Sequence, residues 1–501
     1  MFRKVRFIGL IIVVVAPVFF CHSACAEEYM QAQAAVGNKT TASGGRYTVS
    51  QVALIARQNG IDVMITADAF LNRWQYGLWP LRNVIRKTEQ TRSVMTYGIR
   101  RYLDELKAVQ ERFPRLVIVG GLEAAPFYRW EGNPFYGKFA LKDWHKHLLV
   151  VGLETVRDCK GLPVIGNGTA LAKPAGFKSL LCLFFPILIL SIGLFGMYEG
   201  RFARKDIYMR RHGILLMQWR YYGIALAIAG LLFLINRCPF RDLKYDQYHG
   251  DRGPMPYQNF IDHANRHNGM TFWAHPEAKN VEQRGKIDIE TKEHTGLILE
   301  TRDYTGFAVF YEGYDIIGRP GGLWDSVLRE YCKGGRRSAA WAIGLLDYEQ
   351  RGSLGEEMKN LRTVLLVKET NKDECLKALR EGRAYVAKDA NASRFRLDDF
   401  SVSDSAGTAK ATMGQEVAIT GSPRIRISGR FTGTAETALP VKILLIKDGS
   451  LIGIFEEQAP FDITYDDENA EEPGKHYYRV ELRSSKLTLV TNPVFVTRKV
   501  R

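Results

Sequence analysis

Residues 99–123, IRRYLDELKAVQERFPRLVIVGGLE, decide the fold class. Apolar side chains recur at spacings of three and four between Ile99 and Phe113, which is the period of an amphipathic helix. Pro114 ends that period, and residues 116–119 follow as a short apolar run of the kind found in a buried strand. A helix followed at once by a buried strand, which leads through two glycines to Glu123, indicates an α/β architecture.

The same alternation of helical periods and short apolar runs extends from Val49 to about Lys388, apart from a strongly apolar segment in the middle. Several runs end in a residue that can bind metal or move a proton, namely Asp68, Glu123, His275 and Asp347. The carboxyl ends of the strands of a β/α barrel converge on one rim, so we expect these side chains near one another. An aspartate after a strand is also a common helix N-cap, and this is the competing interpretation of Asp68.

From Phe395 onward the pattern changes to an alternation with period two, broken by turn residues. Asp448-Gly449 separates the apolar runs 441–447 and 451–455, which predicts a hairpin with a two-residue turn. We expect a small β-sandwich over residues 393–501. This region contains no constellation of chemical groups, so we interpret it as a packing or partner-binding module.

The first 26 residues have the pattern of a secretory signal, with a basic start, an apolar run and a small-residue end at Ala24-Cys25-Ala26. A lipoprotein signal that lipidates Cys25 is the alternative, although His22 stands where such signals have an apolar residue. Residues 1–26 are therefore predicted to be a signal peptide or an N-terminal anchor.

Two further apolar stretches, residues 179–197 and 221–235, are long enough to cross or nearly cross a hydrocarbon core of about 30 Å. Both are apolar on all sides, which favours membrane helices over a pair of buried core helices. Between them, six basic residues and two acidic residues give a net charge of +4, which the positive-inside rule places in the cytoplasm. We predict a transmembrane hairpin over residues 178–237 in the cytoplasmic membrane, with both flanks on the extracytoplasmic (periplasmic) side.

Composition excludes several classes of protein. A chain of 501 residues that is 46% hydrophobic and has a mean hydropathy of −0.17 is neither a disordered tail nor a polytopic transporter. The net charge of +15 is spread out, because the leader and the loop of the hairpin account for +3 and +4 of it. Without a concentrated basic face, nucleic acid is not expected as a partner, whereas the lipid bilayer is.

Six stretches occur in an order that resembles the blocks of the PHP (polymerase and histidinol phosphatase) family of metal-dependent phosphoesterases. They are YTVSQVALIARQNGIDVMITAD, VIVGGLEAAPFYRW, HKHLLVVGL, GMTFWAHPE, WAIGLLDYE and CLKALREGRAYV. The C-terminal LTLVTNPVFVT resembles the strand that closes a β-domain found in some members. The resemblance implies a distorted seven-stranded β/α barrel in two parts, residues 27–177 and 238–392, interrupted by the hairpin and followed by the β-sandwich.

The metal motifs of that family are only partly present, because four of their histidines are missing. GNKTTASGG aligns with the opening motif and places Gly37 and Lys39 where the family has histidines. Thr66-Ala67-Asp68 stands in place of Thr-Asp-His, and Asp347-Tyr348-Glu349 in place of Asp-x-His. The chain is therefore expected to have lost part of a site that usually holds up to three metals.

The resemblance aligns Glu123, His147 and His275 with three ligands that share one metal in the family. It places Asp347 beside them as an auxiliary ligand or base, and Asp68 is the second catalytic candidate. A carboxylate with two imidazoles and an open position is also a known catalytic zinc set, whereas added carboxylates such as Asp68 and Glu349 favour magnesium or manganese. We expect a divalent cofactor, zinc, manganese or magnesium, and as few as one ion.

Other histidines are weaker candidates. His145 competes with His147, but only His147 directly precedes the apolar strand. His263 and His267 are four residues apart on one helix face and could hold a metal. No carboxylate accompanies them in the sequence, and such a pair is more typical of a solvent-exposed helix face. The pair Tyr311-Glu312 is expected at the rim of the site.

The leading prediction is an exported, membrane-anchored, metal-dependent hydrolase, and by the resemblance a phosphoesterase that acts on a small-molecule phosphate ester. The competing prediction is a catalytically inactive PHP-like barrel that binds a ligand or an envelope partner. Lys39 favours the second if its ammonium points into the site, because it would then replace the charge of a lost metal.

Overall fold

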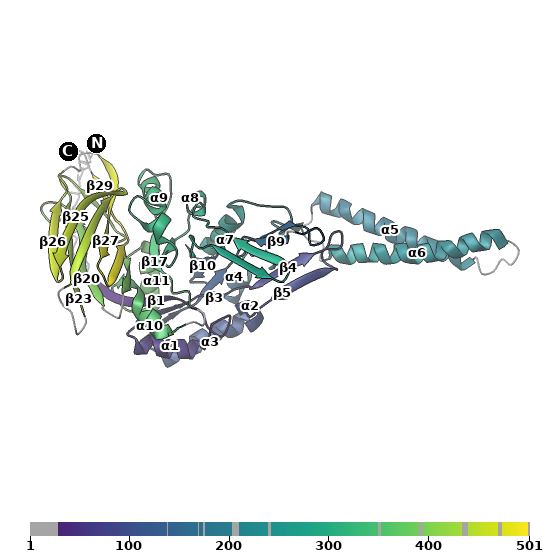
Figure 1. Ribbon diagram of the computed structural model, residues 1–501, viewed down its shortest axis with the longest axis horizontal. Coiled ribbons are helices and arrows are strands. Elements are labelled where there is room, and N and C mark those ends of the chain that lie inside the picture. The colour runs from purple at the N-terminus through teal and green to yellow at the C-terminus, as the bar shows by residue number, and fades with distance from the viewer. Residues whose placement is uncertain are drawn as a thin grey trace, which may run out of the picture.

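The computed structural model describes residues 29–137, 139–168, 170–173, 176–202, 210–238, 242–348, 352–389, 394–432, 439–468 and 473–498. The predicted signal segment and Glu349 lie outside these residues, as do residues 203–209 of the basic segment between the two apolar stretches. The described chain is elongated, with three parts along its long axis (Figure 1). We call them the α/β body (residues 29–173 and 242–389), the helical hairpin (176–238) and the C-terminal β region (394–498).

The α/β body is built on two large sheets. One has eleven strands, and nine of them follow the order β22 (Glu416–Ile419), β29 (Val494–Arg498), β27 (Gly474–Arg483), β28 (Leu487–Thr491), β19 (Ala384–Asp389), β18 (Leu361–Val367), β1 (Met30–Asn38), β2 (Val63–Thr66) and β6 (Val117–Val119). The two others, β24 (Pro440–Lys447) and β25 (Ser450–Gln458), extend from β27. The second sheet has six strands in the order β17 (Trp341–Gly344), β16 (Gly306–Phe310), β13 (Met270–Trp273), β10 (Leu148–Val151), β7 (Gly121–Ala124) and β3 (Asp68–Ala69).

The mixed α/β class expected from the sequence is confirmed, and the backbone ladders of the body form two large sheets. The chain passes directly from the eleven-stranded sheet into the six-stranded sheet at two places, between β2 and β3 and between β6 and β7. Gly121 makes the second passage feasible, since a Cβ atom there would lie 2.1 Å from the carbonyl oxygen of Thr66. On the far side, the amide of Leu346 donates to the carbonyl of Val36 at 2.8 Å, so the sheets also meet there.

Strand direction also differs from that of a parallel barrel. β1, β2 and β6 are parallel, and so are β13, β16 and β17, but β10 is antiparallel to both of its neighbours, β7 and β13. Leu148 at the start of β10 pairs with Ala124 at the end of β7 and with Trp273 at the end of β13. The beginning of β10 therefore lies at the same edge as the ends of its two neighbours.

Helices cover these sheets and confirm the helical periods read from the sequence. The helix predicted before Pro114 is α3 (Ile99–Arg112), and the run that follows it is β6. The others are α1 (Val49–Gln58), α2 (Val94–Tyr97), α4 (Val156–Lys160), α7 (Met255–Arg266), α8 (Leu297–Glu300), the π-helix η1 (Tyr314–Gly318), α9 (Leu323–Cys332), α10 (Leu354–Asn360) and α11 (Lys372–Glu381).

Three smaller sheets lie on the body between its core and the helical hairpin (Figure 1). They are the pair β4 (Arg73–Gly77) and β5 (Arg86–Gln90), the pair β11 (Ala172–Lys173) and β12 (Asp242–Leu243), and a four-stranded sheet of β14 (Asn280–Arg284), β15 (Ile287–Thr291), β9 (Phe139–Lys142) and β8 (Arg129–Gly132).

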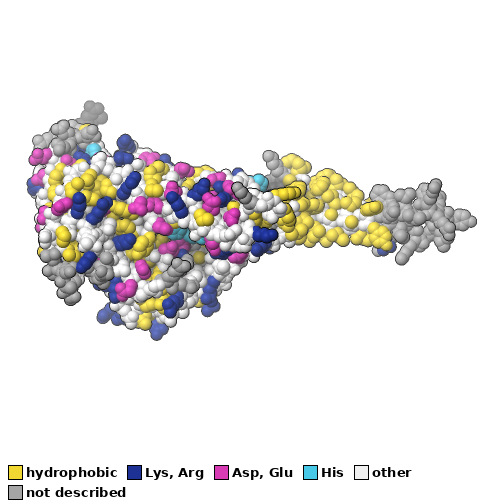
Figure 2. Space-filling view, in the orientation of Figure 1, with side chains coloured by type: hydrophobic (Ala, Val, Ile, Leu, Met, Phe, Trp, Pro, Cys, Tyr) yellow, Lys and Arg dark blue, Asp and Glu magenta, His cyan; other side chains and the backbone are white. Residues whose placement is uncertain are grey.

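The helical hairpin consists of α5 (Phe177–Phe202) and α6 (Arg210–Arg237), which project together from one end of the body (Figure 1). Their backbones approach closely at glycines, because a Cβ atom on Gly223 would lie 2.7 Å from the amide nitrogen of Met197. Small residues permit such close packing between membrane helices. Apolar side chains cover the outside of the hairpin (Figure 2).

The sequence predicts two spans, but one stretch within the described residues, Leu181–Glu199, is long and apolar enough to cross a membrane. Its mean hydropathy is 2.3, and 17% of it is buried. The helix α6 contains the second predicted apolar stretch, residues 221–235.

The C-terminal β region contains the predicted strands. A four-stranded sheet of β21 (Lys410–Thr412), β20 (Phe395–Ser403), β23 (Arg424–Phe431) and β26 (Phe461–Asp466) shares one apolar core with strands of the eleven-stranded sheet. The predicted hairpin turn is confirmed, because Lys447 pairs with Ser450 around Asp448 and Gly449, whose φ angles are 50° and 85°. This region is not a detached module, since β28 pairs with β19 of the body over five residues.

A buried ion pair joins the body to the C-terminal β region. Asp325 on α9 accepts hydrogen bonds from Nε and Nη2 of Arg479 at 2.8 and 2.6 Å, and neither side chain is exposed to solvent. The same carboxylate accepts from the Tyr477 hydroxyl at 2.8 Å and from the Gly321 amide at 2.7 Å. The carboxylate is thus fully engaged, and it neutralises a guanidinium that has no access to water.

Replacing Asp325 by leucine should lower the free energy of unfolding by about 3–5 kcal/mol, because the buried guanidinium loses its counter-charge. The double variant Asp325→Leu/Arg479→Leu removes both charges and should be less destabilised than the single variant. Denaturant unfolding of the full chain in detergent measures both values. Equal losses in the two variants would show that the ion pair itself is unimportant.

Candidate metal centre

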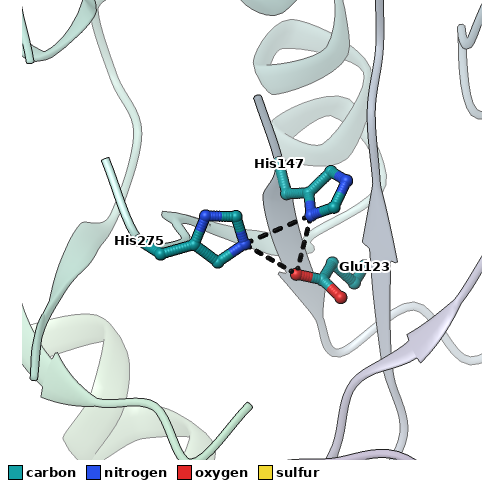
Figure 3. Close-up of side chains that lie close together, drawn as sticks. All are labelled: Glu123, His147 and His275. Atoms are coloured by element: carbon teal, nitrogen blue, oxygen red, sulfur yellow. Dashed lines mark hydrogen bonds and ion pairs between the residues drawn. The ribbon is translucent and has the colours of Figure 1, made fainter. Parts of the chain in front are cut away.

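Three side chains from distant parts of the sequence meet at one edge of the six-stranded sheet. Glu123 lies in β7, His147 directly precedes β10, and His275 follows β13 (Figure 3). The reversed direction of β10 brings them together, because it places the residue before that strand beside the ends of β7 and β13. They are the one group of three or more potential metal ligands among the residues that the structure describes.

The ligand atoms of this group are spaced as a small metal ion requires. Nδ1 of His147 lies 3.2 Å from Oε1 of Glu123, and Nε2 of His275 lies 3.4 Å from the same oxygen. The two ring nitrogens are 3.2 Å apart. Tetrahedral zinc with bonds of about 2.0–2.1 Å has ligand atoms about 3.3 Å apart, so the three side chains fit such an ion.

Lys39 stands next to this group and engages the other carboxylate oxygen. Its Nζ lies 3.0 Å from Oε2 of Glu123 and 2.8 Å from Oδ1 of Asp347. Glu123 therefore presents one oxygen to the imidazoles and the other to a buried ammonium. Asp347, assigned from the sequence as an auxiliary ligand, is held by Lys39 and does not join the three-residue group.

The structure places Asp68 in β3, where its side chain binds the turn that follows β1 and does not join the ligands. Its carboxylate accepts hydrogen bonds from the Thr40 amide at 2.7 Å, the Thr40 hydroxyl at 2.9 Å and the Ser43 hydroxyl at 2.6 Å. Asp68 is fully buried. Its hydrogen bonds fix the turn that begins after Lys39, the residue that directly follows β1. The carboxylate predicted to be catalytic thus positions the turn that carries Lys39.

The backbone around the site adopts conformations that side chains other than glycine rarely take. His275, Glu312 and Asp347 have φ angles of 32°, 59° and 45°. Such positions cost free energy and concentrate at functional sites. Gly37, with φ of 97°, is required for a second reason, since a Cβ atom there would lie 2.6 Å from the Leu345 side chain.

The electrostatics of the group keep Glu123 ionised. Burial raises the pKa of Glu123, but the charges of Lys39 and His147 outweigh burial and hold that pKa well below its usual value. Burial lowers the pKa of His275, but its hydrogen bond to Glu123 and the charge of Asp347 outweigh this effect and raise it. A proton on His275 would compete with a metal, so metal binding should weaken at low pH.

The second nitrogen of His275 weakens the case for a tightly held ion. Its Nδ1 is buried and has no hydrogen-bond partner among the described residues. In histidines that bind metal, the N–H of the second ring nitrogen usually donates a hydrogen bond to a carboxylate or carbonyl group, which fixes the orientation of the ring. We therefore expect a lower metal affinity than in a site with a complete outer layer of hydrogen bonds.

The group opens into a cavity of about 1000 Å³. Its walls include residues that the sequence placed at the rim, Tyr311 and Glu312, and others that it did not single out. The latter include Lys279, Asn280 and Glu357. Lys279 and Asn280 follow closely after His275 and could have been suspected, but Glu357 lies on α10 and reaches the site only through the fold.

The remaining histidines lie elsewhere or serve other contacts. His145 borders the same cavity, and burial together with the nearby His147 and His275 lowers its pKa to about 3. His267 forms an ion pair with Asp158 at 2.9 Å, and Nε2 of His263 lies 3.0 Å from the Asp158 carbonyl oxygen. The pair at the C-terminal end of α7 therefore has a carboxylate beside it, but these side chains contact Asp158 and do not belong to the three-residue group.

No protein-family model and no curated protein matches the chain, whereas several solved structures do. A two-domain protein from Bacteroides vulgatus that contains a predicted PHP-like metal-dependent phosphoesterase is 10% identical, with a TM-score of 0.34, and the match covers 92% of this chain and 95% of that one.

Two shorter matches are of related kinds. A candidate metal-dependent phosphoesterase from Bifidobacterium adolescentis is 12% identical, with a TM-score of 0.27 and coverage of 65% and 91%. An amidohydrolase from Chromobacterium violaceum with bound sulfate and no metal is 13% identical, with a TM-score of 0.26 and coverage of 64% and 89%. The first two of these structures are described as metal-dependent phosphoesterases, as are members of the family that the sequence blocks resemble.

Replacing Glu123 by glutamine should lower the free energy of unfolding by about 1–3 kcal/mol at pH 7, because buried Lys39 loses one of its two carboxylate partners and keeps only Asp347. The pKa of Glu123 in the folded chain lies below the ordinary value of 4.5. Its ionised form therefore contributes full stability above pH 4.5, and that contribution is lost as the pH falls further. Unfolding should be measured in the presence of a metal chelator between pH 7 and 3. The difference in the free energy of unfolding between wild type and variant should narrow below about pH 4.5. A difference independent of pH would contradict the ionised state assigned to Glu123.

Proposed function

We propose that this protein is a divergent PHP-like, metal-dependent hydrolase that acts on a phosphate ester and holds one divalent ion. The observation that carries the proposal is the convergence of Oε1 of Glu123, Nδ1 of His147 and Nε2 of His275 at mutual distances of 3.2–3.4 Å. Zinc fits this donor set best, while manganese and magnesium remain alternatives because the cavity adds carboxylates. The phosphoesterase class itself comes from the family resemblance and from the descriptions of the structural neighbours.

We also infer that the two large sheets act as one distorted barrel of seven strands, with the metal centre on its rim. The seven positions are β1, β2 with β3, β6 with β7, β10, β13, β16 and β17. Support comes from the passages of β2 and β6 between the sheets and from the Leu346 to Val36 hydrogen bond on the other side. A rim of this kind is where barrel enzymes build their sites.

The residues of the cavity have separate tasks in such a reaction. The ion would supply a Lewis acid for the phosphoryl oxygen. Lys279, Asn280 and Tyr311 line the cavity and offer hydrogen-bond donors to the substrate. Asp347 is 40% exposed, faces the same cavity and is the candidate for accepting a proton, with Lys39 holding its carboxylate in place.

One observation favours the alternative, a non-catalytic barrel that binds a ligand or an envelope partner. The ammonium of Lys39 already neutralises Glu123 and Asp347, which in a multinuclear site would face a second metal ion. If the charge of Lys39 is sufficient for stability, the fold does not need a metal. The two functions therefore differ in whether the remaining group still binds an ion.

Incubation with zinc, manganese or magnesium should load the full-length protein in detergent with about one equivalent of metal per chain. His147→Ala and His275→Ala should each abolish this binding, because two ligand atoms do not retain an ion as three do. Both variants should also abolish release of phosphate from an aryl phosphate. Elemental analysis and a phosphate assay measure the two effects.

His263→Ala is the matched control, because it removes an imidazole outside the centre and should leave both metal and activity intact. Lys39→Met tests the role of the ammonium and should raise the amount of bound metal, since two carboxylates lose their cation. Protein that stays metal-free with all three ions, or phosphate release that survives the loss of His147, would favour the non-catalytic alternative.

We further propose that the helical hairpin anchors the chain in the cytoplasmic membrane, with the α/β body and the C-terminal β region on the periplasmic side. The apolar length of Leu181–Glu199 and the exposed side chains of the hairpin support anchoring, and the basic segment between the helices supports the orientation. The domain boundaries predicted from the sequence are part of the same proposal.

Protease added to cells with a permeabilised outer envelope but an intact cytoplasmic membrane should digest the body. The hairpin should survive as a protected fragment, because the bilayer shields helices that cross it. Immunoblots with antibodies against the body and against the hairpin read out the two parts. A body that resists digestion until the cytoplasmic membrane is broken would refute the orientation.

A further inference from the structure

Large aromatic side chains stand exposed on two loops of the α/β body. Trp79, in the connection between β4 and β5, is 79% exposed. Phe135 and Tyr136, in the connection between β8 and β9, are 73% and 88% exposed. Soluble surfaces rarely leave such groups together in water, so these loops need an explanation that packing within the described chain does not provide.

The loop that carries Trp79 is bonded to the end of the helical hairpin. The amide of Asn83 donates to Oδ1 of Asn236 at 2.8 Å, and Nδ2 of Asn83 donates to the Asn236 carbonyl at 2.7 Å. Nδ2 of Asn236 in turn donates to the Pro80 carbonyl at 3.2 Å. Asn236 lies in the last turn of α6, so Trp79 is fixed beside the point where the hairpin enters the body.

The loop that carries Phe135 and Tyr136 lies at the same end of the body. Tyr76, near the end of β4, packs edge-on against Trp130 of β8 and Phe139 of β9, with ring centroids 5.2 and 4.6 Å apart. The tips of the β4–β5 and β8–β9 hairpins therefore extend in the same direction. Figure 1 shows these strands at the end of the body from which α5 and α6 project.

Basic side chains accompany the aromatic ones. Arg86 and Lys87 are exposed at the start of β5, and Arg237 is exposed at the end of α6. Figure 2 shows Lys and Arg side chains at the junction between the body and the apolar surface of the hairpin. Aromatic rings and basic groups at the boundary of an apolar span are the pattern of the bilayer interface, where rings lie among the headgroups and cations face anionic lipid.

The length of the hairpin places these loops at that boundary. The apolar stretch Leu181–Glu199 has 19 residues, or about 28 Å of helix, close to the roughly 30 Å of a hydrocarbon core. Once this stretch fills the core, the body end of the hairpin coincides with the layer of headgroups. The loop that carries Trp79 is bonded to Asn236 at this end, so Trp79 lies at the level of the membrane interface.

We propose that Trp79, Phe135 and Tyr136 form a second contact with the bilayer, in the headgroup layer of the membrane that the hairpin crosses. This inference rests on the membrane placement proposed for the hairpin. Two loops and a hairpin fix the tilt of the body, whereas a hairpin alone would leave it free to swing. Trp74 lies five positions before Trp79, at most about 16 Å away, and lines a cavity that also contacts Glu123 and His147. The contact thus holds the metal centre at a set height above the lipid.

The test uses the full-length protein in nanodiscs of phosphatidylcholine and phosphatidylglycerol, with and without bromine on the upper part of the acyl chains. Bromine quenches nearby tryptophan. The difference between wild type and Trp79→Phe isolates the emission of Trp79, and the same subtraction with Trp219→Phe reports on a residue of α6.

Brominated lipid should quench most of the Trp79 emission. A water-soluble quencher should have little effect on it, because the bilayer covers the ring. Phe135→Ser/Tyr136→Ser should weaken the lipid quenching of Trp79, because one of the two loops loses its hold.

The control with Trp219 separates the two possible failures. If brominated lipid quenches Trp219 but not Trp79, the hairpin is inserted and the proposed contact is wrong. If it quenches neither, the membrane placement of the hairpin fails and this proposal fails with it, while the metal measurements stand independently. A Trp79 shielded from both quenchers would be covered by protein, by a second copy or a partner, which also overturns the proposal.

Discussion

The direction of β10 is the constraint on which the candidate site depends. His147 precedes this strand, whereas Glu123 and His275 lie at the ends of β7 and β13, so three parallel strands would place His147 at the opposite edge of the sheet. Because β10 is antiparallel to both neighbours, Leu148 pairs with Ala124 and Trp273, and the residue before it falls between the two others. Backbone hydrogen bonding, with no contribution from the ligands themselves, therefore brings a carboxylate and two imidazoles within reach of one ion.

Lys39 gives the site a stable charge balance in the absence of metal. Its ammonium holds Glu123 and Asp347, and the turn that carries it is tied to Asp68 by three hydrogen bonds. Lys39 thus supplies a cation between two carboxylates that would otherwise repel each other.

The arrangement along the long axis relates this site to the rest of the chain. The C-terminal β region continues the eleven-stranded sheet through β19 and β28, and the buried pair Asp325–Arg479 locks it to α9. At the other end, Asn83 and Asn236 bind the body to the helical hairpin. The metal centre thus belongs to a body held at both ends, which suits a site whose geometry depends on strand register.

Local pattern was enough to determine the α/β class, the helix before Pro114, the β-rich C-terminus and the Asp448-Gly449 turn, because helical and strand periods and turn chemistry act over a few residues. Resemblance to a family then selected Glu123, His147 and His275, and it flagged Lys39. Only the tertiary structure decided that Asp68 serves a turn, that Asp347 belongs to Lys39 and that the ladders form two sheets. These outcomes depend on strand direction and on contacts between residues that lie from tens to hundreds of positions apart, which no local period encodes.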